Sequence, residues 1–199
     1  LPLGVGDAFA SRWYSTSVAI ESAGTWLLID CPHPIRKMMR EAEVDIDVPN
    51  IDAVVLTHLH ADHVSGLEGL AYFQHFVCRS RTTLLSHPEV GEVLWPKHLE
   101  VSMAELINPE LEPMAHKGFD DYFDYRPLSE EHAVEHGPFR IEVRRTIHHI
   151  PTFAMRIHAE GKVIGHSADT AFDPGLLQWF DDADLIIHET NFGAHTPYE

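Results

Sequence analysis

The sequence is poor in cysteine and in positive charge, and it contains no long apolar run. Two cysteines, Cys31 and Cys78, are too few for a disulfide framework or a cysteine-based zinc site. The 14 lysines and arginines face 31 acidic residues, and a net charge of −17 argues against tRNA or other nucleic acid as a partner. Neither a membrane span nor a signal peptide is visible, so we expect a cytoplasmic protein with no membrane partner.

The pattern of apolar residues predicts one α/β domain over residues 1–199. Alternating, β-branched segments predict strands, and helical spacing predicts helices between them. The expected strands are 17–20, 26–29, 53–56, 82–85, 139–146, 154–158, 162–166 and 185–187, and the expected helices are 35–42, 64–76, 89–95 and 176–180. Prolines and a glycine interrupt residues 96–130, where we expect an irregular insert.

A cluster of metal-ligand residues follows the apolar segment 53–56. In an extended segment His58 and His60 point to the same side and can share one metal ion, while Asp62 and His63 lie in the turn into the next helix. Imidazole and carboxylate groups are ligands that zinc prefers. The alternative is a solvated polar loop, but four ligand-type residues within six positions at a strand end favour a metal site.

The segment THLHADHVSGLEGL at residues 57–70 resembles the signature loop of the metallo-β-lactamase superfamily. Other segments resemble its ribonuclease Z and phosphodiesterase branch, in the same order along the chain: LGVGDAF at 3–9, LLIDC at 27–31, HHIPTF at 148–153, SADT at 167–170 and HETNF at 188–192. The resemblance implies an αββα sandwich of two mixed β-sheets flanked by helices.

The resemblance also implies a dinuclear metal site. His58, His60 and His148 are expected to bind the first ion, Asp62 and His63 the second, and Asp169 to bridge both. His149 is the alternative to His148, and a turn aspartate that caps the next helix is the alternative for Asp169. Two zinc ions are expected, with manganese or iron as alternatives.

Two residues are assigned catalytic roles by the resemblance. Asp62 lies beside the bridging solvent and can orient or deprotonate it. His188 is placed to protonate the leaving oxygen, and its alternative is a strand-end histidine hydrogen-bonded to Glu189. His166 is either near the metal or a satisfied core histidine, and the remaining histidines, His87 among them, are predicted to be structural or surface groups.

These assignments predict a metal-dependent hydrolase in which a metal-bridging hydroxide attacks a small phosphodiester, such as a cyclic nucleotide. The sequence has no basic arm of the kind that grips tRNA, which favours a small-molecule substrate. The alternatives are a lactone or thioester hydrolase similar to glyoxalase II, and a non-catalytic metal-binding sensor domain. A homodimer is compatible with the sequence.

The resemblance implies one further histidine ligand for the second metal, on a segment that follows the HETNF stretch. The sequence ends before such a segment, and His195 lies too early to match. We therefore expect a protein truncated at its C-terminus, or a weak second site in this form.

Overall fold

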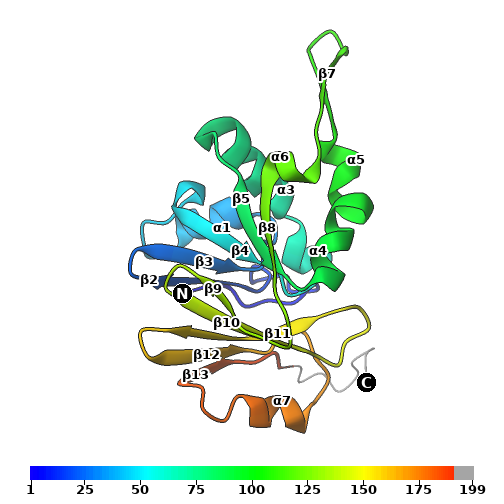
Figure 1. Cartoon of the computed structure of the whole chain (residues 1–199). Helices are drawn as coiled ribbons and strands as arrows, with labels where there is room; N and C mark the ends of the chain where they lie inside the picture. The colour runs from blue at the N-terminus through cyan, green and yellow to red at the C-terminus, as the bar shows by residue number, and fades with distance from the viewer. Residues whose placement is uncertain (191–199) are drawn as a thin grey trace. The chain divides into compact units, whose positions relative to one another are not determined.

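A computed structural model describes residues 1–190. Contacts divide the chain into two compact units, Leu1–Pro127 and Leu128–Glu199, and each is built on its own β-sheet (Figure 1). The single domain expected from the sequence stays a prediction. No helix in the described part of the chain is both long and apolar enough to cross a membrane.

The sheet of the first unit has the strand order β1-β2-β3-β4-β5-β8. Its strands are β1 (Pro2–Gly4), β2 (Ser17–Ser22), β3 (Thr25–Ile29), β4 (Ile51–Val55), β5 (Thr82–Ser86) and β8 (Phe123–Pro127). The first three strands pair antiparallel, whereas β3, β4, β5 and β8 run parallel to one another. The carboxyl ends of these four strands therefore meet at one edge of the sheet.

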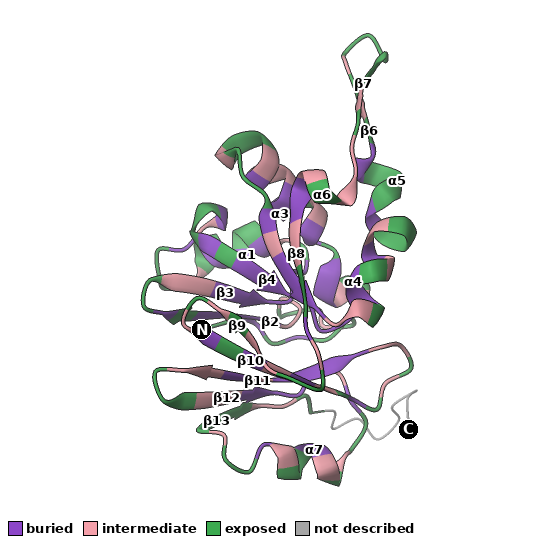
Figure 2. Ribbon diagram, viewed as in Figure 1, coloured by how far each residue is buried: buried purple, intermediate pink, exposed green. Residues whose placement is uncertain are grey.

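The core of the first unit lies around its central strands. The side chains of Leu27, Leu28 and Ile29 on β3, and of Val54 and Val55 on β4, have 0% exposure, so both faces of these strands are covered (Figure 2). Near-continuous apolar runs are typical of such buried parallel strands. The flanking helices are α1 (Ile35–Glu41), α2 (Ala61–Val64), α3 (Leu67–Tyr72), α4 (Pro88–Leu94), α5 (Glu100–Met103) and α6 (Phe119–Tyr122), and α3 continues into a π-helical segment over Phe73–Cys78.

Residues 96–130 contain more regular structure than the sequence predicts. They include α5, α6, the edge strand β8 and a hairpin of β6 (Glu105–Ile107) and β7 (Pro113–His116), which extends away from the sheet of the first unit (Figure 1). Two of the breaking residues fall at the ends of elements. Pro113 is the first residue of β7 and Gly118 precedes α6, so they delimit short elements and do not prevent them.

The sheet of the second unit has the strand order β13-β12-β11-β10-β9. Its strands are β9 (Val134–His136), β10 (Phe139–Arg145), β11 (Phe153–Ala159), β12 (Lys162–His166) and β13 (Leu185–Ile187), of which only the β12–β13 pair is parallel. Helix α7 (Pro174–Trp179) packs against this sheet through Leu176, which clusters with Phe180 and Ala154. A Cβ added at Gly165 would lie 2.7 Å from the Phe180 ring, so this contact requires glycine.

The predicted fold class is confirmed in each unit, since both sheets are mixed and both carry helices. All eight expected strands are present, with ends shifted by at most two residues. The expected helix 64–76 is instead divided into α2, α3 and the π-helical segment. Gly66 lies between α2 and α3, and its backbone closely approaches that of Pro32 at this point.

Candidate metal centre

The histidine cluster predicted from the sequence lies directly after β4. The chain leaves the sheet after Leu56, whose N–H still donates to Leu85 O on β5, and enters α2 at Ala61. His58 is buried and His60 half-buried, and 2.9 Å separates His58 Nε2 from His60 Nδ1. Two nitrogens at this separation can both lie about 2.1 Å from one ion.

Thr57 orients the first of these histidines. The Thr57 hydroxyl donates to Asp30 Oδ2 at 2.7 Å, and its oxygen lies 2.9 Å from His58 Nδ1. Because the hydroxyl proton is used towards Asp30, the oxygen accepts from His58 Nδ1–H. The lone pair of neutral His58 is therefore on Nε2, the atom that faces His60, which is the form a metal ligand requires.

Asp30 orients His63 in the same way. Its Oδ2 lies 2.7 Å from His63 Nδ1, so the proton of neutral His63 is on Nδ1 and its lone pair is on Nε2. That Nε2 lies 3.6 Å from Asp62 Oδ2. A nitrogen and a carboxylate oxygen are thus presented side by side, as the ligand roles predicted for Asp62 and His63 require.

The Asp30 carboxylate itself is buried, with 1% exposure, and sits at the end of β3 with a positive φ of 57°. Burial alone would raise its pKa. The positive charge that His63 carries when protonated, the hydrogen bond from His63, the charge of protonated His58 and the N–H of Thr57 hold the pKa of Asp30 below the usual value. No pattern in the sequence alone gives Asp30 a role. The motif LLIDC contains it, but only the pairing of β3 with β4 brings it to Thr57 and His63.

The second unit presents another pair of predicted ligands. His148 Nε2 lies 3.9 Å from Asp169 Oδ2, and both side chains are partly exposed. The loops that carry them are joined by hydrogen bonds from Thr146 Oγ1 to Asp169 O and from Ala171 N to Ile147 O, each 2.8 Å long. His149 is more exposed than His148.

His188 follows β13 in the second unit. Its Nδ1 lies 2.6 Å from the backbone oxygen of Glu189, so Nδ1–H donates to that carbonyl. The Ser167 Oγ accepts from Glu189 N at 2.9 Å, which ties this strand end to the loop that carries Asp169. His166 is buried and its Nδ1 accepts from Ala168 N, so it shapes the same loop.

The described residues therefore include donors that suit a divalent metal ion. The ligand atoms of His58 and His60 lie within 4.8 Å of one another, as do those of His148 and Asp169. Imidazole nitrogens and carboxylate oxygens are the donors expected for zinc and related ions. His195 lies outside the described residues.

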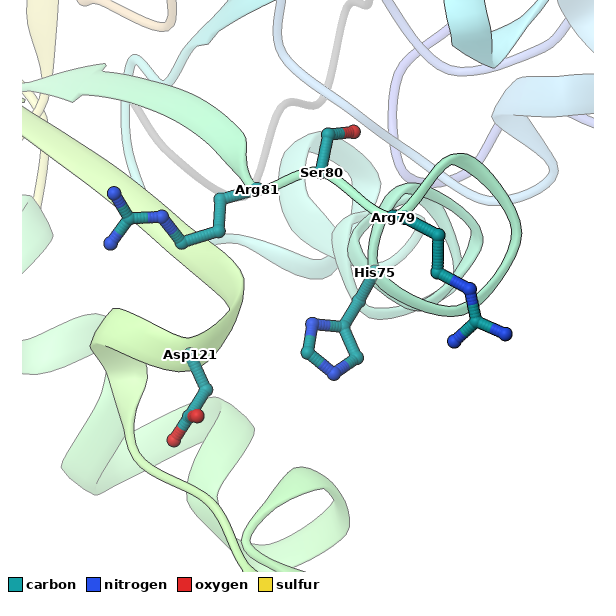
Figure 3. Close-up of a pocket in the computed structure, with 5 residues that line it drawn as sticks. All are labelled: His75, Arg79, Ser80, Arg81 and Asp121. Carbon is teal, nitrogen blue, oxygen red and sulfur yellow. The ribbon is translucent and has the colours of Figure 1, made fainter.

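The first unit also has a surface cavity of about 410 Å³, lined by His75, Arg79, Ser80, Arg81 and Asp121 (Figure 3). The Asp121 carboxylate accepts from Lys117 Nζ and from Gly118 N, and Arg81 donates to Asp120 O. Only His75 and Asp121 have metal-ligand chemistry among the lining residues. The lining of this cavity therefore offers fewer metal-ligand groups than the cluster after β4.

Comparison with known families gives a match over the whole chain. A family model described as anti-Pycsar protein Apyc1 matches residues 1–199. The anti-Pycsar protein Apyc1 of Bacillus phage 010DV004 is 30% identical over 207 residues, covering 97% of this chain and 78% of that protein. That of Paenibacillus sp. (strain J14) is 32% identical over 178 residues, covering 88% and 68%.

Solved structures show the same fold. The metallo-β-lactamase fold protein YhfI from Bacillus subtilis has a TM-score of 0.73 at 20% identity, covering 96% of this chain and 71% of that one. Human tRNase Z, short form, has a TM-score of 0.65 at 21% identity, with coverages of 93% and 75%. A diphosphatase from the PhnP family also has a TM-score of 0.65, at 17% identity, with coverages of 93% and 71%. The metallo-β-lactamase fold predicted from the signature loop is thereby confirmed.

Proposed function

Because the chain belongs to the family of the anti-Pycsar protein Apyc1, we propose that it is a phosphodiesterase that hydrolyses a small diester such as a cyclic nucleotide. The chain is a metal-dependent hydrolase with the metallo-β-lactamase fold. The observation that carries the proposal is the orientation of His58 and His63, whose Nδ1 protons are engaged by Thr57 and Asp30 so that both Nε2 atoms are left as ligands.

The proposed site uses the ligand set predicted from the sequence. We propose that His58, His60 and His148 bind one ion, that Asp62 and His63 bind another, and that Asp169 bridges them. The separations within each unit support this assignment, as does the higher exposure of His149 compared with His148. Zinc is the proposed metal because imidazole and carboxylate donors are typical of its sites.

When bound, a metal pair supplies a nucleophilic hydroxide at neutral pH and stabilises charge on the diester. Asp62 would orient the attacking water through a carboxylate oxygen, since an ionised carboxylate accepts hydrogen bonds and protons only. His188 Nδ1–H is held by Glu189 O, so a proton for the leaving oxygen must come from Nε2. His188 must therefore be an imidazolium to act as the acid.

The charge of the chain supports a small substrate. With a net charge of −17, the surface would repel a polyanion over most of its area, whereas a diester with one negative charge meets far less repulsion. A cytoplasmic location also remains a proposal. Two free thiols, Cys31 and Cys78, support it, because reducing compartments keep cysteines unpaired.

The test is a substrate panel with the zinc-loaded protein. It contains the four common 3′,5′-cyclic mononucleotides, bis(p-nitrophenyl) phosphate, a thioester and a lactone, and product formation is followed by chromatography. We expect turnover of diesters, and loss of that turnover in His63→Ala. His116→Ala, which removes an exposed histidine of the β6–β7 hairpin, is the matched control. Turnover of the thioester or lactone without any diester would overturn the proposal.

A further inference from the structure

The parallel strands of the first unit bring a third chemistry-bearing residue to the edge that carries the histidine cluster. Asp30 follows β3, the segment 57–63 follows β4, and His87 follows β5. These strands are neighbours in the sheet and run parallel, so their carboxyl ends meet at one edge (Figure 1). Ligands of open α/β sheets bind beyond such ends.

The register places His87 beside the start of the cluster. Val55 on β4 pairs with Leu85 on β5, and the N–H of Leu56 donates to Leu85 O at 2.9 Å. Two residues beyond the Val55–Leu85 pair, the chains have reached Thr57 and His87. Neighbouring strands lie about 4.8 Å apart, so the half-buried His87 stands one strand away from the turn that carries His58 and His60.

Helix α4 fixes which ring nitrogen carries the proton in neutral His87. The residue is the N-cap of this helix, and its Nδ1 accepts from Glu89 N at 3.3 Å, while its backbone oxygen accepts from Val90 N and Gly91 N. A ring nitrogen that accepts an N–H carries no proton, so the neutral ring has its proton on Nε2. His87 is therefore set up as a hydrogen-bond donor, the opposite of His58 and His63, whose Nε2 atoms carry lone pairs.

A diester anion needs hydrogen-bond donors for its non-bridging oxygens. The neighbouring side chains of Asp30 and Asp62 are acceptors when ionised, and those of His58 and His63 present lone pairs. We propose that His87 is a substrate-binding residue of this hydrolase, and that its Nε2–H donates to a non-bridging phosphate oxygen of the diester. The inference rests on the proposed phosphodiesterase function and adds a residue that selects a phosphodiester.

Two substitutions separate this role from the capping role. In His87→Ser the hydroxyl still caps α4, because serine is among the best N-cap residues, but the Nε2–H is lost. In His87→Ala both are lost. We expect kcat/KM for a cyclic nucleotide to fall about 10- to 100-fold in both variants, mostly through KM, as for loss of one hydrogen bond to a charged group. The Tm should fall only in His87→Ala.

The controls are His116→Ser and the zinc content. His116→Ser removes a hairpin histidine and should leave KM unchanged, and zinc per chain should match the wild type in every variant. An unchanged KM in His87→Ser, with diesters still turned over by the wild type, overturns the inference alone. Loss of zinc in His87→Ser overturns it too, because His87 would then support the ligands.

A binding measurement keeps the inference testable if the wild type hydrolyses no diester, the outcome that refutes the proposed function. Inorganic phosphate is titrated calorimetrically into the zinc-loaded wild type and into His87→Ser. We expect the variant to bind phosphate about 10-fold or more weakly. Equal phosphate affinities, or no phosphate binding by the wild type, would overturn the role of His87.

Discussion

Asp30→Asn is the substitution that tests most directly whether a buried carboxylate prepares the histidines for metal. Asp30 Oδ1 accepts from Thr57 N, and Oδ2 accepts from both Thr57 Oγ1 and His63 Nδ1. Asparagine keeps the acceptor for Thr57 N, but its amide then faces the other two groups as a donor. His63 must accept at Nδ1 and carry its proton on Nε2, the atom that is proposed to bind metal.

The expected magnitudes concern two separate quantities. Loss of a partner that orients a metal ligand lowers metal affinity by about 10- to 100-fold, or about 1.4–2.8 kcal/mol. The metal-free protein also loses hydrogen bonds to a charged group, each worth about 1.5–3 kcal/mol. Because Asp30 is 1% exposed, solvent does not replace the lost hydrogen bonds. Thr57 can redirect its hydroxyl, which limits the loss of stability. We expect the free energy of unfolding to fall by about 2–4 kcal/mol.

The assay has one readout for each quantity. Zinc affinity is measured by competition with a chromogenic chelator, and the stability of the chelated protein by urea unfolding. Asp52→Asn is the matched control. Within residues 1–190, the Asp52 side chain on β4 accepts one hydrogen bond, from the backbone N–H of Trp26 to Oδ2, and asparagine can replace it there. If Asp30→Asn bound zinc as tightly as Asp52→Asn does, the reasoning on His63 would be refuted.

Three further substitutions have defined outcomes. Asp62→Ala should abolish turnover and lower the zinc content, as measured by elemental analysis, and full activity would remove Asp62 from the site. His188→Ala should lower kcat by about 10²–10⁴-fold with zinc content retained, and loss of zinc would instead mark His188 as a ligand. Asp47→Asn should lower stability by about 0.2–1 kcal/mol at pH 7, since hydrogen bonds from Arg36 hold the pKa of Asp47 below its usual value. A carboxyl group with a depressed pKa stabilises the folded protein at pH values above its unfolded-state pKa of about 3.9, and this stabilisation is lost as the pH falls through its folded-state pKa. Urea unfolding should therefore show no difference between Asp47→Asn and the wild type at the lowest pH.

The strands and the signature loop could be predicted from the sequence because their patterns are local. The apolar segment before His58 and the ligand spacing up to His63 lie within a dozen residues. Residues 96–130 were harder to predict, since the edge strand β8 mixes Phe123 with polar residues and gains its pairing from β5, far away in the sequence. Short elements delimited by proline and glycine resemble irregular loops until such pairing is known.

Asp30 and His87 could not be assigned for a related reason. Each follows a strand, but their importance depends on which strands are neighbours, and Asp30 precedes its partner Thr57 by 27 residues. His87, at the end of β5, has no ligand-like spacing in the sequence, because its proposed role is to donate a hydrogen bond and not to bind metal. Sheet order, which the sequence pattern leaves undetermined, is the information that makes both residues part of one edge.

The buried charge of Asp30 makes better sense as part of a site than as a source of stability. Burying a carboxylate is costly, and pairs of this kind often contribute less to stability than well-packed apolar residues of the same size. Asp30 also has a positive φ, which is unfavourable for most residues. The carboxylate orients Thr57 and, through Thr57, His58. It also determines which ring nitrogen of neutral His63 carries the proton. Removing Asp30 alone leaves Thr57 and His63 without their acceptor and lowers stability. The fold can gain stability only where all three polar groups are replaced by apolar residues, and such a variant should lose metal affinity because the site requires the carboxylate.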